Sequence, residues 1–288
     1  MDQIDTISYA QSTDPWLKRK IVNFVELATG REKITNIYEK LKNEPFQIPK
    51  FFSKGIRLSQ LCLKYNQEME SNIPKEGPLV FVANHPFGII DGLILCEIAA
   101  RIRGDFRILL NNRLMKDEEL NKLFLPVDFD GTPEATKKNV KTKKDAQQIL
   151  ENGGTVIIFP SGGVATRWKF GLGPLEELPW STFAAKIIMK SKASVVPVKF
   201  EGENSAAFHM ASSISESARL SLFIREVTRR MGTTIEFKIG KPIHFKEMEQ
   251  LEGRKSLTEF LKKKVDELSS KSPRNKFLAL PKFLKKSA

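Results

Sequence analysis

The sequence predicts an α/β fold, with a mostly parallel or mixed central sheet and helices on both of its faces. Short apolar runs rich in β-branched residues lie at 79–83, 106–110, 155–159 and 194–200, and segments of helical character separate them. Strands that are apolar along their whole length are typical of a sheet covered on both sides. The 288 residues are enough for one large domain with a full core.

The helices expected between these strands cover residues 92–101, 117–123, 142–151 and 182–191. We further expect helical structure over 204–231, a strand at 233–239 and a charged surface helix at 257–268. Near the N-terminus, Asp14-Pro15 is typical of a helix start, because Asp caps the first turn and Pro lacks the N–H that would go unpaired there. This start opens two amphipathic helices that run to Asn43, and a third helix is expected over 51–63.

Three parts follow from this pattern: an N-terminal helical segment at 1–50, the α/β domain at 51–270, and a C-terminal tail at 271–288. In the tail, lysines and an arginine alternate with Phe and Leu. Such interleaving is typical of segments that bind a membrane interface. A disordered solubilising tail is the alternative.

The net charge of +13 indicates an anionic partner, for which an anionic membrane surface or an acidic carrier protein is suited. Nucleic acid has only the charge in its favour, since no zinc spacing or RNA-binding motif is present. Cys62 and Cys96, both in segments expected to be helical, favour a reducing compartment over a disulfide framework. An acidic N-terminus and the lack of a long apolar run predict neither a signal peptide nor a membrane-spanning helix. We therefore expect a cytoplasmic protein attached peripherally to the inner face of the cytoplasmic membrane.

A possible proton acceptor follows the first strong strand. The apolar residues 79–83 run into Asn84-His85-Pro86-Phe87-Gly88, and Asp91 opens the next helix. Histidine is the side chain whose usual pKa lies nearest neutral pH, so it can take a proton from a hydroxyl. A carboxylate on its other ring nitrogen would fix the tautomer and stabilise the imidazolium. The alternative is that His85 merely caps or packs in the turn.

A second loop of the same kind follows the strand at 155–159. There the chain continues as Phe159-Pro160-Ser161-Gly162-Gly163, with Arg167 close behind. A third strand at 194–200 contains Val196-Pro197-Val198. In an α/β sheet, loops that follow strands converge at one edge, which is where ligands bind.

Together these motifs resemble those of the glycerolipid acyltransferase superfamily, in a divergent bacterial form of the 1-acylglycerol-3-phosphate acyltransferase type. That superfamily has Asn-His, four residues and Asp in its first block, Phe-Pro-Glu-Gly-Thr-Arg in its third, and Val-Pro-Val in its fourth. The likeness covers about residues 56–242, in the order of the family's blocks. Here five residues separate His85 from Asp91, which the flexible backbone of Gly88 can accommodate. Ser161 stands where the family has Glu, and extra residues precede Arg167.

The resemblance implies that His85 is the general base, that Asp91 orients it, and that an acyl thioester reacts directly with a lipid hydroxyl. It implies an acyl-CoA or an acyl-carrier protein as donor and a lysolipid or glycerolipid-type acceptor, with no metal and no further cofactor. The substrate-binding residues implied are Asn84, Asn112, Arg113, Ser161, Gly162, Gly163 and Arg167.

Other interpretations remain open. A catalytically silent lipid- or carrier-binding protein on the same fold is one, and O-acylation of an amino-acid-containing lysolipid is another. A nucleophilic Ser161 is disfavoured, because position 159 is Phe and not the Gly of a Gly-x-Ser-x-Gly elbow. Cys96 is expected to be a packed core residue, and His209 and His244 to be surface or packed histidines.

Overall fold

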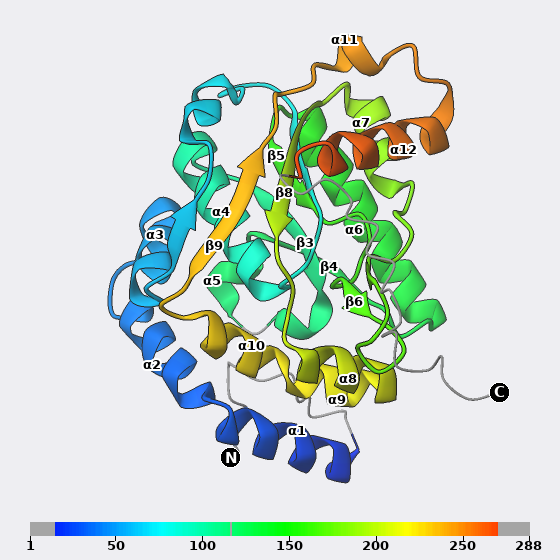
Figure 1. The fold of residues 1–288 in the computed structure, drawn as a ribbon. Helices are drawn as coiled ribbons and strands as arrows, with labels where there is room; N and C mark the ends of the chain where they lie inside the picture. The colour runs from blue at the N-terminus through cyan, green and yellow to red at the C-terminus, as the bar shows by residue number, and fades with distance from the viewer. Residues whose placement is uncertain (1–14, 116, 270–288) are drawn as a thin grey trace, which may run out of the picture.

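A computed structural model of the protein describes residues 15–115 and 117–269; the tail predicted at 271–288 lies outside this range. The described residues form a seven-stranded sheet in the order β1-β9-β8-β2-β5-β3-β4 and a two-stranded hairpin, β6-β7 (Figure 1). The strands are β1 (Cys62–Lys64), β2 (Leu79–Ala83), β3 (Arg107–Asn111), β4 (Phe124–Val127), β5 (Thr155–Ile158), β6 (Thr166–Arg167), β7 (Leu175–Glu176), β8 (Ser194–Glu201) and β9 (Thr234–Ile239).

The helices are α1 (Trp16–Ala28), α2 (Arg31–Lys42), α3 (Ile48–Leu58), α4 (Ile89–Arg103), α5 (Glu118–Asn121), α6 (Pro133–Glu151), α7 (Phe183–Ser191), α8 (Ala206–Ile214), α9 (Glu216–Ser221), α10 (Phe223–Arg230), α11 (Phe245–Met248) and α12 (Gly253–Asp266). Two short 3-10 turns, η1 (Gln67–Asn72) and η2 (Asn112–Leu114), complete the secondary structure of the described residues.

The central strands β8, β2, β5, β3 and β4 are parallel, whereas β9 pairs antiparallel with β8. This mixed, mostly parallel sheet confirms the predicted fold class. Strand β2 shows why both faces are covered, because its five residues are all buried. Leu79, Phe81 and Ala83 pack with α3 and α4, while Val80 and Val82 pack with α6, α7 and α12. Alternating residues of one strand thus belong to two separate cores.

A third, smaller core closes the edge at which the parallel strands end. It contains Val22 of α1, Val164, Phe208 of α8, Leu220 of α9 and Phe223 of α10. In Figure 1 the yellow helices α8–α10 and the blue α1 lie together at this end of the molecule. The carboxyl ends of β2 and β5 therefore meet a helical layer that is separate from the two faces of the sheet.

One predicted helix is wrong at its end. The helix expected over 51–63 ends at Leu58, and Cys62–Lys64 form β1, paired parallel with β9. Gln60 takes a left-handed φ of 53°, which stops the helix and redirects the chain. Cys62 is therefore an exposed strand residue. Cys96 is buried in α4, where burial raises the pKa of its thiol, so its prediction as a packed residue is confirmed.

The side chain of Asn66 connects the segment that follows the edge strand β1 to the end of β9. Its amide donates to the carbonyl of Ile239 at 2.8 Å and accepts the N–H of the same residue at 2.9 Å, at the end of β9.

We expect Asn66→Ala to lower the free energy of unfolding by about 1–3 kcal/mol, because both backbone groups of Ile239 lose their partner. Urea unfolding measures this, with Asn72→Ala on the same exposed turn as a matched control. Equal stability of the two variants would contradict it.

Candidate active site

The loop between β2 and α4 holds the histidine and the carboxylate. Gly88, with a left-handed φ of 85°, caps α4, and Asp91 is the third residue of the helix. The Nδ1 atom of His85 lies 3.1 Å from Oδ2 of Asp91. The five-residue spacing therefore still brings the two side chains together, and Gly88 supplies the conformation that this requires.

Asp91 is completely buried, and its Oδ2 also accepts the N–H groups of Phe87 at 2.8 Å and Gly88 at 3.0 Å. Burial raises the pKa of Asp91 above its usual value, while His85 and the two N–H groups act in the opposite direction. A positive charge on His85 would therefore reduce the free-energy cost of keeping the Asp91 carboxylate ionised away from water. This is the arrangement needed to stabilise an imidazolium.

Contacts of both the ring and the backbone fix the position of His85. Its ring stacks on Phe159 after β5, with centroids 3.9 Å apart and an angle of 26° between the planes. Its backbone N–H donates to Glu177 Oε1 at 2.9 Å, and its carbonyl accepts the N–H of Ala165 at 2.8 Å. The side chain keeps 17% of its surface exposed, although Nδ1 is buried against Asp91. The exposed part of the ring is thus the part available to a substrate.

Asn84 lies beside this pair but is engaged with the sheet. Its amide donates to the carbonyl of Phe200 at 2.9 Å and accepts the N–H of Phe200 at 2.7 Å. The side chain is buried and joins the end of β2 to the end of β8. Asn84 therefore has a structural role next to the site, whereas the family resemblance implied that it binds substrate.

The loop after β5 contains Ser161, Gly162 and Gly163. The Ser161 hydroxyl is buried and donates to the carbonyl of Gly163 at 2.9 Å. Gly162 is exposed and has a left-handed φ of 66°. The hydroxyl therefore stabilises the turn, and it does not point to a partner base.

Asn112 and Arg113 lie in η2, directly after β3, and both are half-buried. The Arg113 N–H donates to the side chain of Asn111 at 3.0 Å, which starts the turn. The next residue, Leu114, packs on the third core. This turn thus belongs to the same edge of the sheet as the His85 and Ser161 loops.

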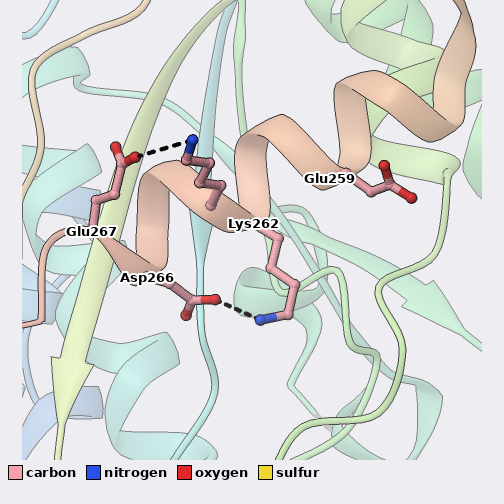
Figure 2. A pocket seen from close by; sticks show the side chains of 5 residues that line it. Glu259, Lys262, Asp266 and Glu267 are labelled. Atoms are coloured by element: carbon pink, nitrogen blue, oxygen red, sulfur yellow. Dashed lines mark hydrogen bonds and ion pairs between the residues drawn. The ribbon is translucent and has the colours of Figure 1, made fainter. Parts of the chain in front are cut away.

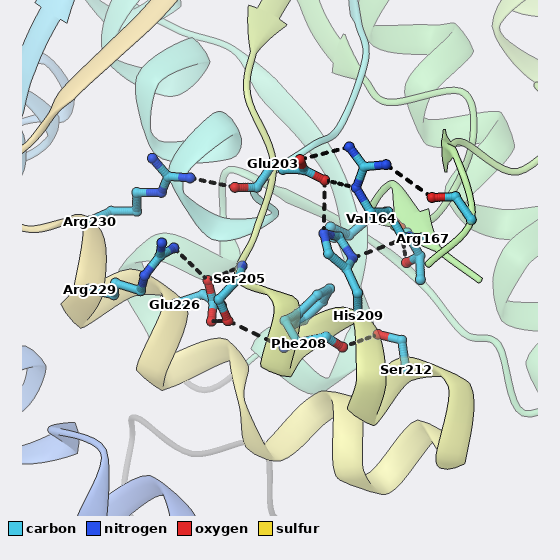
Figure 3. Close-up of polar contacts among 12 residues, drawn as sticks. Val164, Arg167, Glu203, Ser205, Phe208, His209, Ser212, Glu226, Arg229 and Arg230 are labelled. Atoms are coloured by element: carbon cyan, nitrogen blue, oxygen red, sulfur yellow. Dashed lines mark hydrogen bonds and ion pairs between the residues drawn. The ribbon is translucent and has the colours of Figure 1, made fainter. Parts of the chain in front are cut away.

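Arg167 is held by an acidic residue that the sequence did not single out. Its Nε and Nη2 donate to the two carboxylate oxygens of Glu203, the second at 2.8 Å, and Nη1 donates to the carbonyl of Gly173 at 3.0 Å (Figure 3). Glu203 raises the pKa of Arg167, and Arg167 lowers that of Glu203. Three of the five N–H donors of the guanidinium are thereby engaged.

His209 belongs to the same group, and of the two predicted states, surface or packed, the structure shows the packed one. It is buried on α8, its Nδ1 accepts the backbone N–H of Arg167 at 3.2 Å, and Nε2 lies 3.3 Å from Glu203 (Figure 3). Burial lowers the pKa of His209, so the neutral form with the proton on Nε2 fits both contacts.

Arg230 connects this group to the histidine loop. It donates to the backbone carbonyl of Glu203 and its guanidinium lies 4.4 Å from the centre of the Phe87 ring. Burial and the nearby Arg229 lower the pKa of Arg230, and the negative charges of Glu226, Asp91 and Glu203 partly offset this. A desolvated positive charge therefore lies within electrostatic reach of the carboxylate.

The contacts of Glu177, Glu203 and Arg230 join segments that are far apart in the chain. No local motif marks these residues, so sequence reasoning missed them. Phe159, which stacks on His85, belongs to the predicted motif, but its residue type alone indicates no role in the site.

Two hollows on the surface are unrelated to this site. One lies on α12 among Glu259, Lys262, Lys263, Asp266 and Glu267, where Lys262 and Asp266 pair at 2.5 Å (Figure 2). The other lies between α3 and α4, near Tyr65 and Arg101. Neither includes the His85 loop. Over residues 15–115 and 117–269, no group of three or more His, Cys, Asp or Glu side chains is arranged to hold a metal ion.

None of the helices within the described ranges is long and apolar enough to cross a membrane.

Comparison with known proteins gives consistent results. The profile of the Acyltransferase family matches residues 18–272. The lyso-glycine lipid O-acyltransferase of Phocaeicola vulgatus is 25% identical over 270 residues, which cover 88% of this chain and 89% of the relative. The protein of the same description from Bacteroides thetaiotaomicron is 28% identical over 225 residues, covering 72% and 78%.

Among solved structures, the 1-acyl-sn-glycerophosphate acyltransferase PlsC from Thermotoga maritima aligns with a TM-score of 0.51 and 19% identity, over 88% of this chain and 89% of that one. This likeness shows the shared fold. Since the family profile spans nearly the whole chain, and the histidine and carboxylate of its first motif meet in the structure, the protein belongs to the Acyltransferase family within the glycerolipid acyltransferase superfamily and is an acyltransferase.

Proposed function

We propose that the protein transfers a fatty acyl group from an acyl thioester to the hydroxyl of a lysolipid, with His85 as general base. The observation that carries this proposal is the 3.1 Å contact of His85 Nδ1 with the buried Asp91 carboxylate. Nδ1 carries the proton that faces Asp91, so Nε2 has the free electron pair. Nε2 takes the proton of the acceptor hydroxyl as its oxygen attacks the thioester carbonyl. The carbon–sulfur bond then breaks and the imidazolium returns the proton to the leaving thiolate.

The amino-acid-containing lysolipid is the acceptor that we favour. Both curated relatives described above are lyso-glycine lipid O-acyltransferases, which supports an acceptor of this kind. The pairing of Arg167 with Glu203 supports it independently, because a guanidinium already neutralised by a carboxylate attracts a phosphate monoester less strongly. A panel containing lyso-glycine lipid, lysophosphatidate and lysophosphatidylethanolamine distinguishes these acceptors.

For the donor, the exposed lysines of α6 support an anionic molecule. Helix α6 follows Phe129, whose ring lies 3.8 Å from the position that a β-carbon on Gly162 would take, so the helix begins beside the Ser161 loop. The exposed lysines are Lys137, Lys138, Lys141, Lys143 and Lys144. Acyl-CoA and acyl-carrier protein both have the charge that would suit them. Parallel assays with the two donors decide between them.

We further propose that the protein works in the cytoplasm at the inner face of the membrane, where a lysolipid acceptor is present. A catalytically silent binding protein and a nucleic-acid-binding protein are the remaining alternatives. Neither has a use for a histidine whose ring nitrogen is held by a buried carboxylate.

His85→Ala should reduce turnover at least about 10³-fold, because the base is absent. Asp91→Asn should have an effect on the order of 10³–10⁴-fold. The amide oxygen can still accept the N–H groups of Phe87 and Gly88, but it lacks the charge that stabilises the imidazolium. Thermal unfolding should confirm that both variants are folded. Near-normal acyl transfer by folded His85→Ala would end the proposal.

Ser161→Ala should keep turnover within about tenfold of the wild type, because the hydroxyl only stabilises the turn through Gly163. Mass spectrometry of the protein incubated with donor alone should detect no acyl-enzyme. A covalently acylated Ser161, together with a loss of activity like that of His85→Ala, would instead indicate a nucleophilic serine.

Arg167→Ala should raise the KM for one of the two substrates with little change in kcat, as expected when an anionic group is bound equally in ground and transition states. The matched variant Glu203→Gln frees the guanidinium and should lower the same KM. If Arg167 serves only to pair with Glu203, both substitutions will reduce thermal stability and leave both KM values unchanged.

A further inference from the structure

Arg230, the last residue of α10, lies against the turn that carries the catalytic pair. Its guanidinium carbon is 4.4 Å from the centre of the Phe87 ring, and the guanidinium donates to the backbone carbonyl of Glu203 (Figure 3). Phe87 is buried, and its N–H donates to Oδ2 of Asp91 at 2.8 Å. Phe87 therefore contacts the guanidinium with its ring and the carboxylate with its backbone.

The segment after β8 determines where both the ring and the guanidinium lie. A β-carbon on Gly202 would be 2.7 Å from Cζ of Phe87, so only glycine leaves room for the ring at this position. The next residue, Glu203, provides the carbonyl that accepts the N–H of Arg230. A cation over an aromatic face is attracted to it, and more strongly when both are removed from water. Arg230 is thus fixed next to the turn by two contacts from different parts of the fold.

The positive charge of Arg230 is not taken up by a carboxylate of its own. Its Nε is buried and has no hydrogen-bond partner among the described residues, and the acceptor of its Nη2–H is a carbonyl oxygen. Arg167 differs, because both carboxylate oxygens of Glu203 accept its N–H groups. A guanidinium stays protonated at any pH at which the enzyme works, so Arg230 supplies a permanent charge.

Asp91 needs such a charge before the reaction starts, when His85 is neutral. Its Oδ2 accepts two backbone N–H groups, whereas Oδ1 is buried and has no hydrogen-bond partner among the described residues. An ionised carboxylate in this state is unfavourable unless a nearby charge compensates it. Burial lowers the pKa of Arg230, and Asp91 is one of the carboxylates that act in the opposite direction. Because Coulombic attraction is mutual, Arg230 favours the ionised form of Asp91.

We propose that Arg230 is a positioning residue that keeps Asp91 ionised while His85 is still neutral. The inference rests on the proposed role of His85 as general base. Without the charge of Arg230, the buried pair would take up a proton at a higher pH. A proton on Asp91 would remove the charge that stabilises the imidazolium, and a proton on His85 would occupy Nε2, so in either case the base would be lost.

Other charged side chains near the pair are engaged with one another. Arg167 pairs with Glu203, and Arg229 lies 3.5 Å from Glu226. Neither ion pair includes Arg230, so replacing Arg230 leaves both in place. The charged or titratable side chains around the pair and Arg230 are, within the described residues, Glu26 and Arg31 where α1 meets α2, Arg167 of β6, Glu177 after β7, Glu203 after β8, His209 of α8, Arg219 of α9, and Arg225, Glu226 and Arg229 of α10.

The test compares the pH dependence of kcat/KM with the titration of His85 followed by nitrogen NMR, in the wild type and in Arg230→Gln. The glutamine can still donate to the Glu203 carbonyl but lacks the charge. The acidic limb of kcat/KM and the His85 titration should both move to higher pH by about one pH unit or more, because an opposite charge close to a carboxyl group lowers its pKa by about 1–3 units.

Three further variants separate charge from packing. Arg230→Met also lacks the charge and keeps a long side chain against Phe87, so it should give the same shift and replaces Arg230→Gln if that variant is unfolded. Arg230→Lys keeps the charge and should restore most of the wild-type profile. Arg229→Met, at the neighbouring exposed position of α10, is the matched control and should leave both midpoints unchanged.

A structural role alone would lower turnover or thermal stability at every pH without moving either midpoint, and this result would overturn the inference. An equal shift in Arg230→Lys or in Arg229→Met would also overturn it, because the charge at position 230 would then not be the cause. The His85 titration does not depend on turnover. A shifted titration in a protein whose folded His85→Ala variant still transfers acyl groups normally would support the effect of Arg230 and contradict only the proposed function.

Discussion

The contact between His85 and the buried carboxylate of Asp91 is the interaction on which the rest of the site depends. Asp91 is removed from water, yet its Oδ2 accepts two backbone N–H groups and lies 3.1 Å from Nδ1 of the ring. A buried carboxylate is destabilising unless charge or hydrogen bonds compensate it. A negative charge on Asp91 is thus best stabilised when His85 is protonated, which is the state that general-base catalysis forms.

The surrounding fold serves to keep this contact in one geometry. Gly88 permits the turn that brings Asp91 back to the ring, and a methyl group there would lie 3.0 Å from Phe223 and 3.1 Å from Val164. The third core therefore packs directly against the loop that carries His85. Because the same core contains residues of α1, α8 and α9, these helices are coupled to the catalytic loop by packing.

The sequence predicted five of the seven strands of the large sheet and the closeness of His85 and Asp91, but it missed β4 and took β1 for the end of a helix. The strands 79–83 and 194–200 are continuous apolar runs, and the strand–turn–helix spacing places His85 and Asp91 in the same turn. The hairpin β6–β7 was missed because its strands are two residues long and lack periodicity. Glu177 and Glu203 were missed because their partners lie 92 and 36 residues away, and such contacts leave no local pattern.

The most direct test of this account is the tautomer of His85, measured by nitrogen NMR of the imidazole in protein labelled at its three histidines. At a pH where the ring is neutral, the account predicts a proton on Nδ1, facing Asp91, and an unprotonated Nε2 available to the acceptor hydroxyl. The His85→Ala protein assigns the signal. A neutral His85 with its proton on Nε2 would contradict the account, since Asp91 would then not orient the ring and Nε2 could not accept a proton.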